Sequence, residues 1–243
     1  MILRAPGTHS VEFDQPVAVI GDIHGRSDQL AALLDQLGDL RIVVAGDLCD
    51  RGPDTRGVLD LLISRQALGV RGNHEEWFSK FMSGHGFERY ALGPVMGGRN
   101  TLGSYGVDMG RIEGIAAQWE MVPRAHETFI NSLGTAMDLR VGGESFWIIH
   151  AGIPLFRNTG DVPSEAIVPW MAQHHPDSLL WGNTQPEDMQ RVDRTVVMGH
   201  MIQPRPIDLG HVIAIDTGAG TLPMGPLTAV VLPERRFVSV YPD

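Results

Sequence analysis

Polar side chains that can bind metal ions and phosphate gather in three short motifs between residues 21 and 75. The motifs read GDIHG from Gly21, GDLCDRG from Gly46 and RGNHE from Arg71. They supply aspartate, histidine and asparagine side chains together with an arginine. Carboxylate and imidazole groups bind divalent cations, and a planar guanidinium fits two oxygens of a phosphate. The motifs therefore indicate metal-assisted phosphate chemistry.

Each motif follows a short apolar segment that predicts a buried strand. These segments span residues 17–20, 42–45 and 67–70, and two stretches with helical periodicity separate them. A strand, a polar turn and a helix that repeat in this way predict a parallel sheet with crossover helices. Because ligands bind beyond the carboxyl ends of the strands in such sheets, the three motifs should meet at one edge.

The second half of the chain predicts mostly strands, and two of them also end near a histidine. A hairpin is expected around Gly142-Gly143, because two glycines suit a tight turn with positive φ angles. Its second arm leads into His150, and a later strand leads into His200. We therefore expect two imidazole groups at strand ends, in addition to those of the motifs.

Composition and charge narrow the class of protein. The 243 residues are 43% hydrophobic and 20% charged, which predicts one domain over residues 1–243 with a cap or insertion at about 83–133. The net charge of -10 argues against nucleic acid or an anionic membrane as a partner. The sequence shows neither a signal peptide nor an apolar run of membrane-spanning length, so a cytoplasmic location is expected.

The candidate metal ligands are mixed in type, since three offer oxygen and three offer imidazole nitrogen. This mixture suits Mn, Fe or Zn better than Ca or Mg, which prefer oxygen alone. Six ligands exceed the needs of one tetrahedral ion and suit two ions, about 3.5–4 Å apart, that share a carboxylate. The candidates are Asp22, His24, Asp47, Asn73, His150 and His200.

In their order along the chain, the motifs resemble the signature of the phosphoprotein phosphatase (PPP) family of metallophosphoesterases, in particular its bacterial serine/threonine protein phosphatases. The matching stretches are GDIHG, GDLCDRG, GNHE, a lone His150 and Gly199-His200, and Asp216-Thr217-Gly218 is similar to the family's tail. A lone GNHE would be weak evidence, whereas five motifs in order cover most of the chain. The resemblance implies an α/β, calcineurin-like fold in which mixed β-sheets pack as a sandwich flanked by helices.

The resemblance also divides the candidate ligands between two divalent ions. It implies Mn²⁺ as the expected metal, with Fe or Zn as alternatives. Asp47 would bridge the two ions. The other ligands would be Asp22 and His24 on one ion, and Asn73, His150 and His200 on the other.

Catalytic roles follow from the same resemblance. His74 would be the general acid that protonates the leaving alkoxide, with Asp50 orienting it and favouring its imidazolium form. Arg51 would clamp the phosphate of the substrate, with Asn73 as a second phosphate contact.

The chain departs from the family's pattern at one phosphate-binding position. In relatives, a second arginine follows two residues after the segment that resembles residues 179–181, and this chain has Asn183 there. Arg157 and Arg205 are candidates for its role, and the sequence does not choose between them.

The first functional hypothesis is a phosphomonoester hydrolase that acts on phosphoserine or phosphothreonine in a protein or peptide, by one-step attack of metal-bound hydroxide. The alternative is a nucleotide hydrolase of the diadenosine tetraphosphatase type, which shares much of the metal signature. The intact Asp50-Arg51 pair favours the phosphatase, since the hydrolase group usually lacks that aspartate.

Two remote alternatives are a non-catalytic phosphopeptide-binding module, which Asn183 keeps open, and an aspartic protease. The protease reading rests on Asp216-Thr217-Gly218 and leaves the metal-type residues unexplained. The native metal, the preference among phosphorylated side chains and the oligomeric state stay open at this stage.

Overall fold

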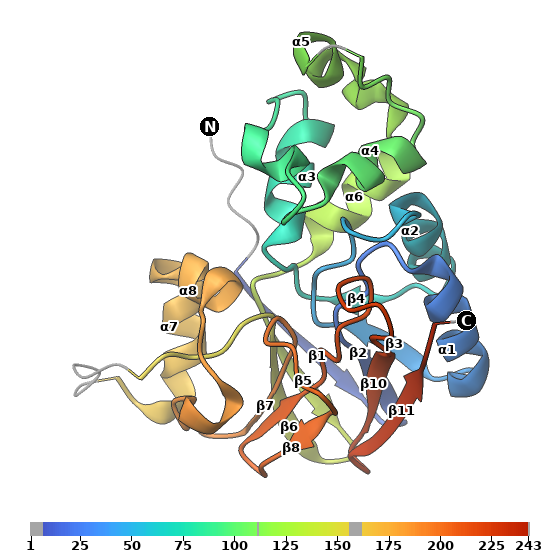
Figure 1. Ribbon diagram of the computed structural model, residues 1–243. Helices are drawn as coiled ribbons and strands as arrows, with labels where there is room; N and C mark the ends of the chain where they lie inside the picture. Colours follow the sequence, from blue (N-terminus) through green and yellow to red (C-terminus); the bar gives the residue numbers. More distant parts are fainter. Residues whose placement is uncertain (1–6, 111, 156–161, 243) are drawn as a thin grey trace.

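A five-stranded sheet carries the three motifs, with strands in the order β11-β10-β2-β3-β4 (Figure 1). The computed structural model of the chain describes residues 7–110, 112–155 and 162–242. Strands β2, β3 and β4 are parallel, as predicted, and β10 pairs antiparallel with β2 and β11. The strands span Val17–Ile20 (β2), Arg41–Val44 (β3), Leu68–Gly69 (β4), Leu227–Leu232 (β10) and Arg236–Val240 (β11).

A second, six-stranded sheet has the order β1-β5-β6-β7-β9-β8. Its strands β6, β7 and β9 are parallel, so their carboxyl ends lie at the same edge. The expected hairpin joins β5 to β6, and both glycines of its turn have positive φ angles. The strands span Thr8–Phe13 (β1), Ala136–Val141 (β5), Glu144–Ile149 (β6), Thr195–Met198 (β7), Ile207–Asp208 (β8) and Val212–Ala214 (β9).

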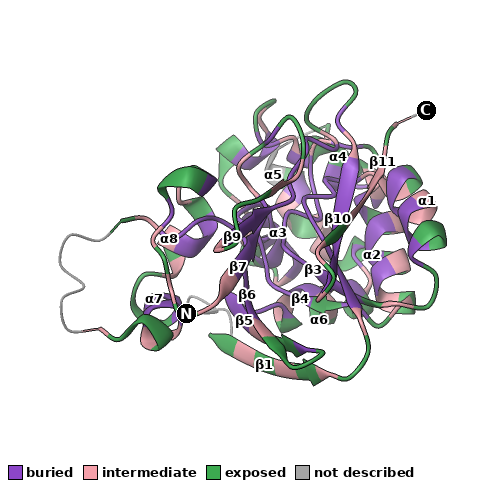
Figure 2. Cartoon of the chain, turned by 90° about the horizontal axis from the view of Figure 1, so that it is seen from below, coloured by how far each residue is buried: buried purple, intermediate pink, exposed green. Residues whose placement is uncertain are grey.

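The two sheets pack face to face, because each presents a row of apolar side chains to the other. Val17, Val19 and Val43 from the first sheet meet Leu139 and Phe146 from the second in one buried cluster. The other face of β2 packs against the helices, and all four of its residues are buried. Its neighbour β10 is buried along its whole length, whereas β1 at the edge of the second sheet is exposed or half-buried (Figure 2). A strand covered on both faces reads as a continuous apolar run. The expected fold of mixed sheets in a sandwich flanked by helices is confirmed.

Helices α1 (Ser27–Leu37) and α2 (Thr55–Ser64) cover the outer face of the first sheet. The apolar face expected for α1 is confirmed, since all four of its predicted leucines are buried. A serine directly before an apolar helical face is typical of an N-cap, so the sequence predicts that Ser27 caps α1. This prediction is wrong, because α1 has no side-chain cap. The Ser27 hydroxyl donates instead to Asp54 Oδ2 at 2.6 Å, and Asp54 caps α2 by accepting from the Gly57 amide at 2.9 Å.

The segment from residue 83 to 133, called the cap segment below, lies with α3 (His74–Met82) at one end of the molecule (Figure 1). Its helical break at Pro123 is confirmed. The aromatic residues Trp77, Phe78 and Phe81 of α3 are fully buried at its base. The reading as a single domain with an insertion stays a prediction. The elements are η1 (Arg89–Leu92), α4 (Gly98–Ser104), α5 (Ile112–Ile115), η2 (Ala116–Met121) and α6 (Arg124–Ser132).

Helices α7 (Ile167–His174) and α8 (Pro176–Trp181) cover the outer face of the second sheet. A helix near α7 was expected, whereas α8 and the short strand β8 were not. Two single-turn helices, η3 (Ser164–Ala166) and η4 (Pro186–Asp188), flank this pair. Among the residues that the structure describes, no helix combines the length and the apolar character needed to cross a bilayer.

Candidate metal and phosphate site

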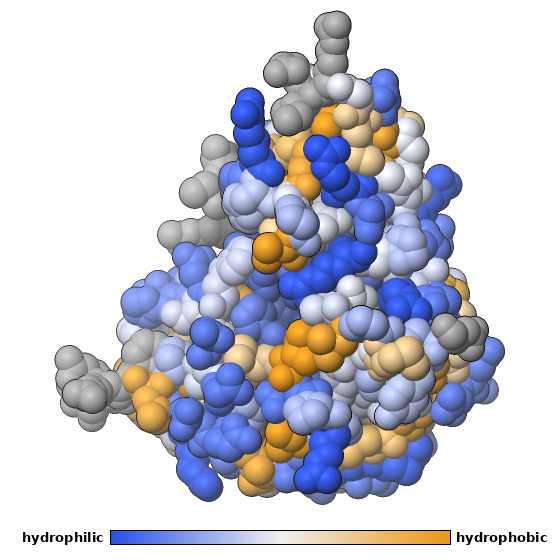
Figure 3. Space-filling model, in the orientation of Figure 1, coloured by the Kyte–Doolittle hydropathy of each residue, from blue (hydrophilic) through white to orange (hydrophobic). Residues whose placement is uncertain are grey.

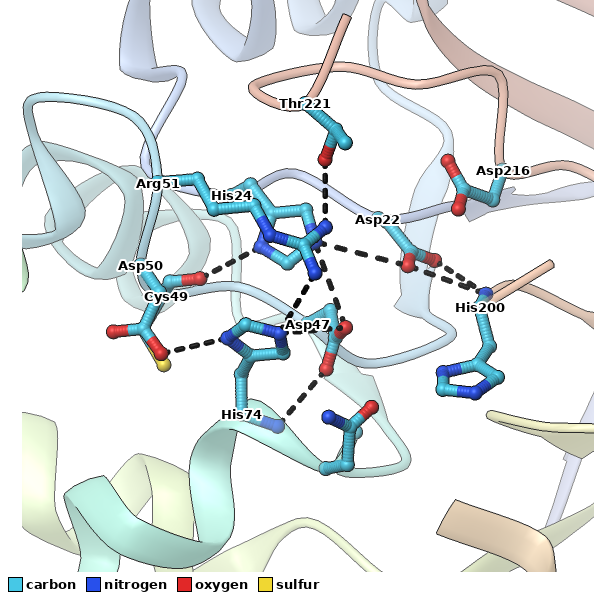
Figure 4. A network of polar contacts seen from close by, with 12 residues as sticks. Asp22, His24, Asp47, Cys49, Asp50, Arg51, His74, His200, Asp216 and Thr221 are labelled. Carbon is cyan, nitrogen blue, oxygen red and sulfur yellow. Dashed lines mark hydrogen bonds and ion pairs between the residues drawn. The ribbon is translucent and has the colours of Figure 1, made fainter. Parts of the chain in front are cut away.

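The six predicted metal ligands come together where the carboxyl ends of strands from both sheets meet (Figure 4). Asp22 accepts from the His200 amide at 3.0 Å, and His200 Nδ1 lies 3.1 Å from His150 Nε2. His150 Nε2 in turn lies 3.0 Å from Asn73 Oδ1 and 3.4 Å from Asp47 Oδ1. Segments separated by more than a hundred residues therefore form one rim, as the sequence predicts.

Asp47 occupies the centre of this rim. It belongs to two clusters in which potential ligand atoms lie within 4.8 Å of one another, one with His24 and His74 and one with His150 and His200. Asp22 lies at the edge of the first cluster, 4.0 Å from His24 Nε2. The position of Asp47 suits the predicted bridging ligand, although the first cluster also contains His74, which the sequence assigns to acid catalysis.

Backbone carbonyls fix the orientation of two histidine rings. His24 Nδ1 donates to the Cys49 carbonyl at 2.9 Å, and His150 Nδ1 donates to the Ala45 carbonyl at 2.9 Å. The proton on Nδ1 leaves Nε2 of each neutral ring as an acceptor that faces the rim. A metal-binding histidine is typically oriented by such a bond from its other nitrogen.

The electrostatics of the rim favour positive charge at its centre. Burial lowers the pKa of His150, but the charge and hydrogen bond of Asp47, followed by Asp22, outweigh burial and raise this pKa to about 10. Burial and the neighbouring Asp216 raise the pKa of Asp22 well above its usual value. Because carboxylate oxygens, an amide oxygen and imidazole lone pairs converge here, the donor set fits divalent cations.

Left-handed backbone conformations are concentrated in the same place. The φ angles are +46° at His24, +52° at Asp47, +73° at Asp50, +61° at Arg51 and +63° at His200. A residue with a side chain is unfavourable in the left-handed region of φ/ψ space, at a cost of about 1–3 kcal/mol. It keeps this conformation only where the surrounding structure holds it there. These conformations therefore lie in the loops that position the candidate ligands and Arg51, the candidate phosphate-binding residue.

Glu75 holds one of these loops, a role that the sequence analysis does not assign to it. The side chain is fully buried, and its two oxygens accept from four backbone amides. Because these amides belong to both the second and third motifs, one carboxylate ties the two motifs together. The donors are Gly72 at 2.7 Å, Leu48 at 2.8 Å, Asp47 at 2.9 Å and Cys49 at 3.3 Å.

His74 and Asp50 form the pair that the sequence predicts. His74 Nδ1 lies 2.6 Å from Asp50 Oδ2, and both side chains are buried. Burial lowers the pKa of His74, but Asp47 and then Asp50 outweigh it and raise this pKa. The imidazolium form expected of a general acid is therefore favoured.

Two further residues orient Asp50. Trp77 Nε1 of α3 donates to Asp50 Oδ2 at 2.8 Å, and the Thr101 hydroxyl of α4 donates to Asp50 Oδ1 at 2.6 Å. Thr101 lies in the cap segment, so the cap segment reaches the catalytic pair directly. Nothing in the motif pattern identifies Thr101, because its partner lies 51 residues earlier in the chain.

Arg51 extends over the rim from the second motif. Its Nη1 donates to Thr221 Oγ1 at 2.6 Å and to His24 Nε2 at 2.7 Å, and Nη2 lies 3.1 Å from His74 Nε2 (Figure 4). A guanidinium in this position can reach an anion placed beside His74.

Asp216 is a further residue of the site. Its carboxyl lies beside that of Asp22, is almost fully buried, and accepts from the Gly218 amide at 2.8 Å (Figure 4). Burial raises its pKa to about 6. Its place at a strand end is the signal that could have added it to the ligand set.

The replacement for the missing second arginine is still a prediction. Arg157 lies outside the described residues, and both Asn183 and Arg205 are exposed. Cys49 is fully buried, and burial raises the pKa of its thiol. The reading of Cys49 as a small buried side chain is thus confirmed.

Arg51, Gly220 and Thr221 line two cavities. The first, called the cap-side cavity, has a volume of about 600 Å³, and its other lining residues are 92–95, 97, 99 and 100. The second, called the loop-side cavity, has a volume of about 440 Å³ and is lined by Arg26, Asp28, residues 51–53 and residues 220–223. Both volumes lie in the range of small-molecule sites.

Comparison with known proteins places this geometry among phosphoesterases. The profile of the calcineurin-like phosphoesterase family matches residues 15–215. A bis(5'-nucleosyl)-tetraphosphatase [asymmetrical] of Oceanobacillus iheyensis is 26% identical over 92% of this chain and 91% of its own length. The corresponding protein of Anoxybacillus flavithermus is 28% identical over 91% of this chain and 92% of its own.

Other relatives match over less of the chain or in fold alone. Serine/threonine-protein phosphatase 1 of Salmonella typhimurium is 48% identical, but over 25% of this chain and 30% of its own. A solved structure proposed to be a diadenosine tetraphosphatase superimposes with a TM-score of 0.65 at 22% identity, covering 97% of this chain and 98% of its own.

Proposed function

Because the chain belongs to the calcineurin-like phosphoesterase family, we propose that it hydrolyses dinucleoside tetraphosphates asymmetrically, into a nucleoside triphosphate and a nucleoside monophosphate. The similarity to the asymmetrical tetraphosphatases supports this proposal, since it extends over more than nine-tenths of both chains. Similarity to the serine/threonine phosphatase covers a quarter of the chain. This reverses the order of the two sequence-based hypotheses.

The share of the chain that is similar matters because the rim would bind the phosphoryl group, whereas the residues around it would bind the rest of the substrate. The metal and phosphate ligands serve any phosphoester, whereas the walls around them select the rest of the substrate. Full-length similarity includes those walls, among them the cap segment. The two cavities beside Arg51 also offer room for more than a phosphate group.

The chain's own residues would bind and orient the scissile phosphoryl group. Asp22, His24, Asp47, Asn73, His150 and His200 would hold two cations, proposed to be Mn²⁺, with Fe or Zn as alternatives. When bound, these would supply Lewis-acid stabilisation of the phosphoryl oxygens and would acidify a water molecule. Arg51 would bind a phosphoryl oxygen, and Asn73 would be a second phosphate contact.

His74 would hold a proton for the leaving oxygen at Nε2, because its Nδ1 is engaged by Asp50 at 2.6 Å. As water adds to phosphorus, the bond to the leaving oxygen breaks and that oxygen takes the proton. A polyphosphate leaving group is a far weaker base than a serine alkoxide. Its departure would therefore depend less on this proton.

Product analysis with added Mn²⁺ tests the proposal. We expect diadenosine tetraphosphate to yield ATP and AMP in equal amounts, with kcat/KM at least about tenfold above that for a phosphoserine peptide. Two molecules of ADP would contradict asymmetrical cleavage. Turnover of the phosphopeptide without turnover of the dinucleotide would overturn the assignment of substrate.

The second candidate function is that of a serine/threonine protein phosphatase. The close match to the Salmonella typhimurium phosphatase and the intact pair of His74 and Asp50 favour it. A strong proton donor is what an alkoxide leaving group requires. Under this alternative, phosphopeptides are preferred, and loss of His74 slows them more than any nucleotide.

A further inference from the structure

We propose that the cap-side cavity binds the nucleoside triphosphate half of the substrate, with Arg99 as the residue that sets this preference, and that the loop-side cavity takes the monophosphate half. This assignment rests on the proposed function and adds the orientation in which the substrate would bind. Both cavities include Arg51, so a phosphate chain that crosses Arg51 would enter one cavity on each side.

The charges of the two cavities differ. The cap-side cavity contains Arg51 and Arg99, and among the described residues that line it there is neither an aspartate nor a glutamate. In the loop-side cavity Arg26 faces Asp28, which accepts from Arg26 Nε at 2.9 Å and from Nη2 at 2.6 Å. The cap-side cavity thus has more uncompensated positive charge, which suits the half of the substrate that carries more phosphates.

Arg99 is free to bind an anion. Within the described part of the chain its guanidinium has no carboxylate partner. Its Nη1 makes a weak hydrogen bond to Met109 Sδ at 3.9 Å. An exposed guanidinium can bind two phosphate oxygens in a bidentate manner.

The backbone around Arg99 is anchored to the catalytic loop. Asn100 Nδ2 donates to the Arg51 carbonyl at 2.5 Å. Gly97, with φ of +82°, lies so close that a Cβ atom there would be 2.6 Å from the Arg51 amide nitrogen. Because residues on both sides of Arg99 contact Arg51, the backbone that carries Arg99 is held next to Arg51, and both arginines line the same cavity.

Apolar residues complete the cap-side wall. Leu92 and Pro94 line the cavity, and Val95 lines it with 80% of its surface exposed. In the space-filling view, hydrophilic residues lie in the hollow below the cap segment, with hydrophobic patches beside them (Figure 3). A phosphate-binding cation next to exposed apolar surface suits a nucleotide, whose base is flat and poorly hydrated on its faces.

Arg99→Ala tests the assignment, with Arg99→Lys as the conservative variant and Arg89→Ala as the control. Arg89 is an exposed arginine of the same cap segment that does not line the cavity. We expect Arg99→Ala to raise KM for diadenosine tetraphosphate about tenfold more than KM for p-nitrophenyl phosphate. Arg99→Lys should recover part of this loss, and Arg89→Ala should match the wild type with both substrates.

Inhibition of p-nitrophenyl phosphate hydrolysis by ATP and by AMP tests which half of the substrate each cavity binds. Arg99→Ala should raise the inhibition constant of ATP about tenfold and that of AMP less than twofold. An equal increase for AMP and ATP, or no increase for either, would overturn the assignment of the cavities.

The same assays separate this inference from the proposed function. If the wild type cleaves the dinucleotide and Arg99→Ala is indistinguishable from it, the cavity assignment fails and the proposed function stands. If the wild type does not cleave the dinucleotide but ATP inhibits through Arg99, the proposed function fails and the cap-side cavity remains a nucleoside triphosphate site.

Discussion

The rim of candidate ligands and the wall of the cap-side cavity both include contacts with Arg51, but they are built in opposite ways. On the rim, Asp47 and His150 are almost fully buried, and each has several polar partners at fixed distances. On the wall, Val95 and Arg99 are exposed, and Arg99 has one weak recorded contact.

This difference shows where reaction chemistry and substrate choice reside. Cations and a phosphoryl group require donor atoms at fixed positions, which buried and multiply bonded side chains provide. A nucleoside or a peptide can be recognised by exposed side chains that other sequences replace. The metal motifs therefore indicate phosphoester hydrolysis, the reaction of the family, whereas the two proposed functions differ in what the wall would bind.

The largest effect is expected from Asp47→Asn, which removes the charge shared by both ligand clusters. We expect metal content and activity to fall together, with activity lower by on the order of 10³-fold or more, because transition-state stabilisation worth several kcal/mol is lost. Elemental analysis and phosphate release measure the two effects. The exposed Asp35→Asn on α1 is the control, and full metal content in Asp47→Asn would contradict a bridging role.

Replacement of His74 by Asn should affect substrates with poor leaving groups more than substrates with good ones. Substrates with poor leaving groups should slow by about 10²–10⁴-fold, whereas p-nitrophenyl phosphate, which needs little protonation, should slow far less. The ratio of kcat/KM for an alkyl phosphate and p-nitrophenyl phosphate measures this difference, with bound metal unchanged. Equal slowing of both substrates would exclude His74 as the acid, and His85→Asn in the cap segment provides the control.

Glu75→Gln tests the link between the second and third motifs. One carboxylate oxygen becomes an NH₂ group that faces backbone N–H donors, so the free energy of unfolding should fall by about 2–3 kcal/mol. Denaturant titration measures this loss. Glu76→Gln is the control. Trp181 Nε1 donates to Glu76 Oε2 at 2.6 Å, and glutamine keeps an oxygen acceptor for this bond, so the free energy of unfolding should hardly change. Equal stability of the two variants would show that the four amide contacts do not support the rim.

Thr101→Val is expected to have the smallest effect of the four substitutions. It tests whether Thr101 supports the reaction through Asp50 or belongs to the wall that would bind the substrate. The substitution removes the donor to Asp50 Oδ1 while keeping the shape of the side chain. We expect a loss of about 1–2 kcal/mol in stability and a fall in kcat rather than a rise in KM, since Asp50 orients His74. Thr128→Val on α6 is the control. A change in KM for nucleotides alone would place Thr101 with the substrate wall instead.

The sequence anticipated the parts of the site that depend on local patterns. Apolar runs of four residues predicted the positions of β2 and β3, and polar residues directly after strands indicated the candidate ligands. Parallel strands carry the residues that follow them to one edge, so Asp22 and Asp47 could be placed together from the sequence. His200 follows β7 of the other sheet, and the packing of the two sheets brings it to Asp22. The apolar face of α1 followed from spacing in the same way.

The tertiary structure alone decided which polar groups support these ligands. Glu75 accepts from amides of two motifs, and Thr101 reaches Asp50 from another helix, because the loops fold over one another in space. Ser27 was misplaced as a cap since its partner, Asp54, is local in space and not in sequence. Hydrogen bonds of this kind leave no periodic signal.

The amino-acid sequence thus determined the chemistry of this protein, because cations and phosphate dictate which side chains must follow which strands. The exposed wall proposed to select the substrate was decided by the tertiary structure. Residues from 92 to 100 share the cap-side cavity with Gly220 and Thr221, which are far away in the chain, because the cap segment packs beside Arg51.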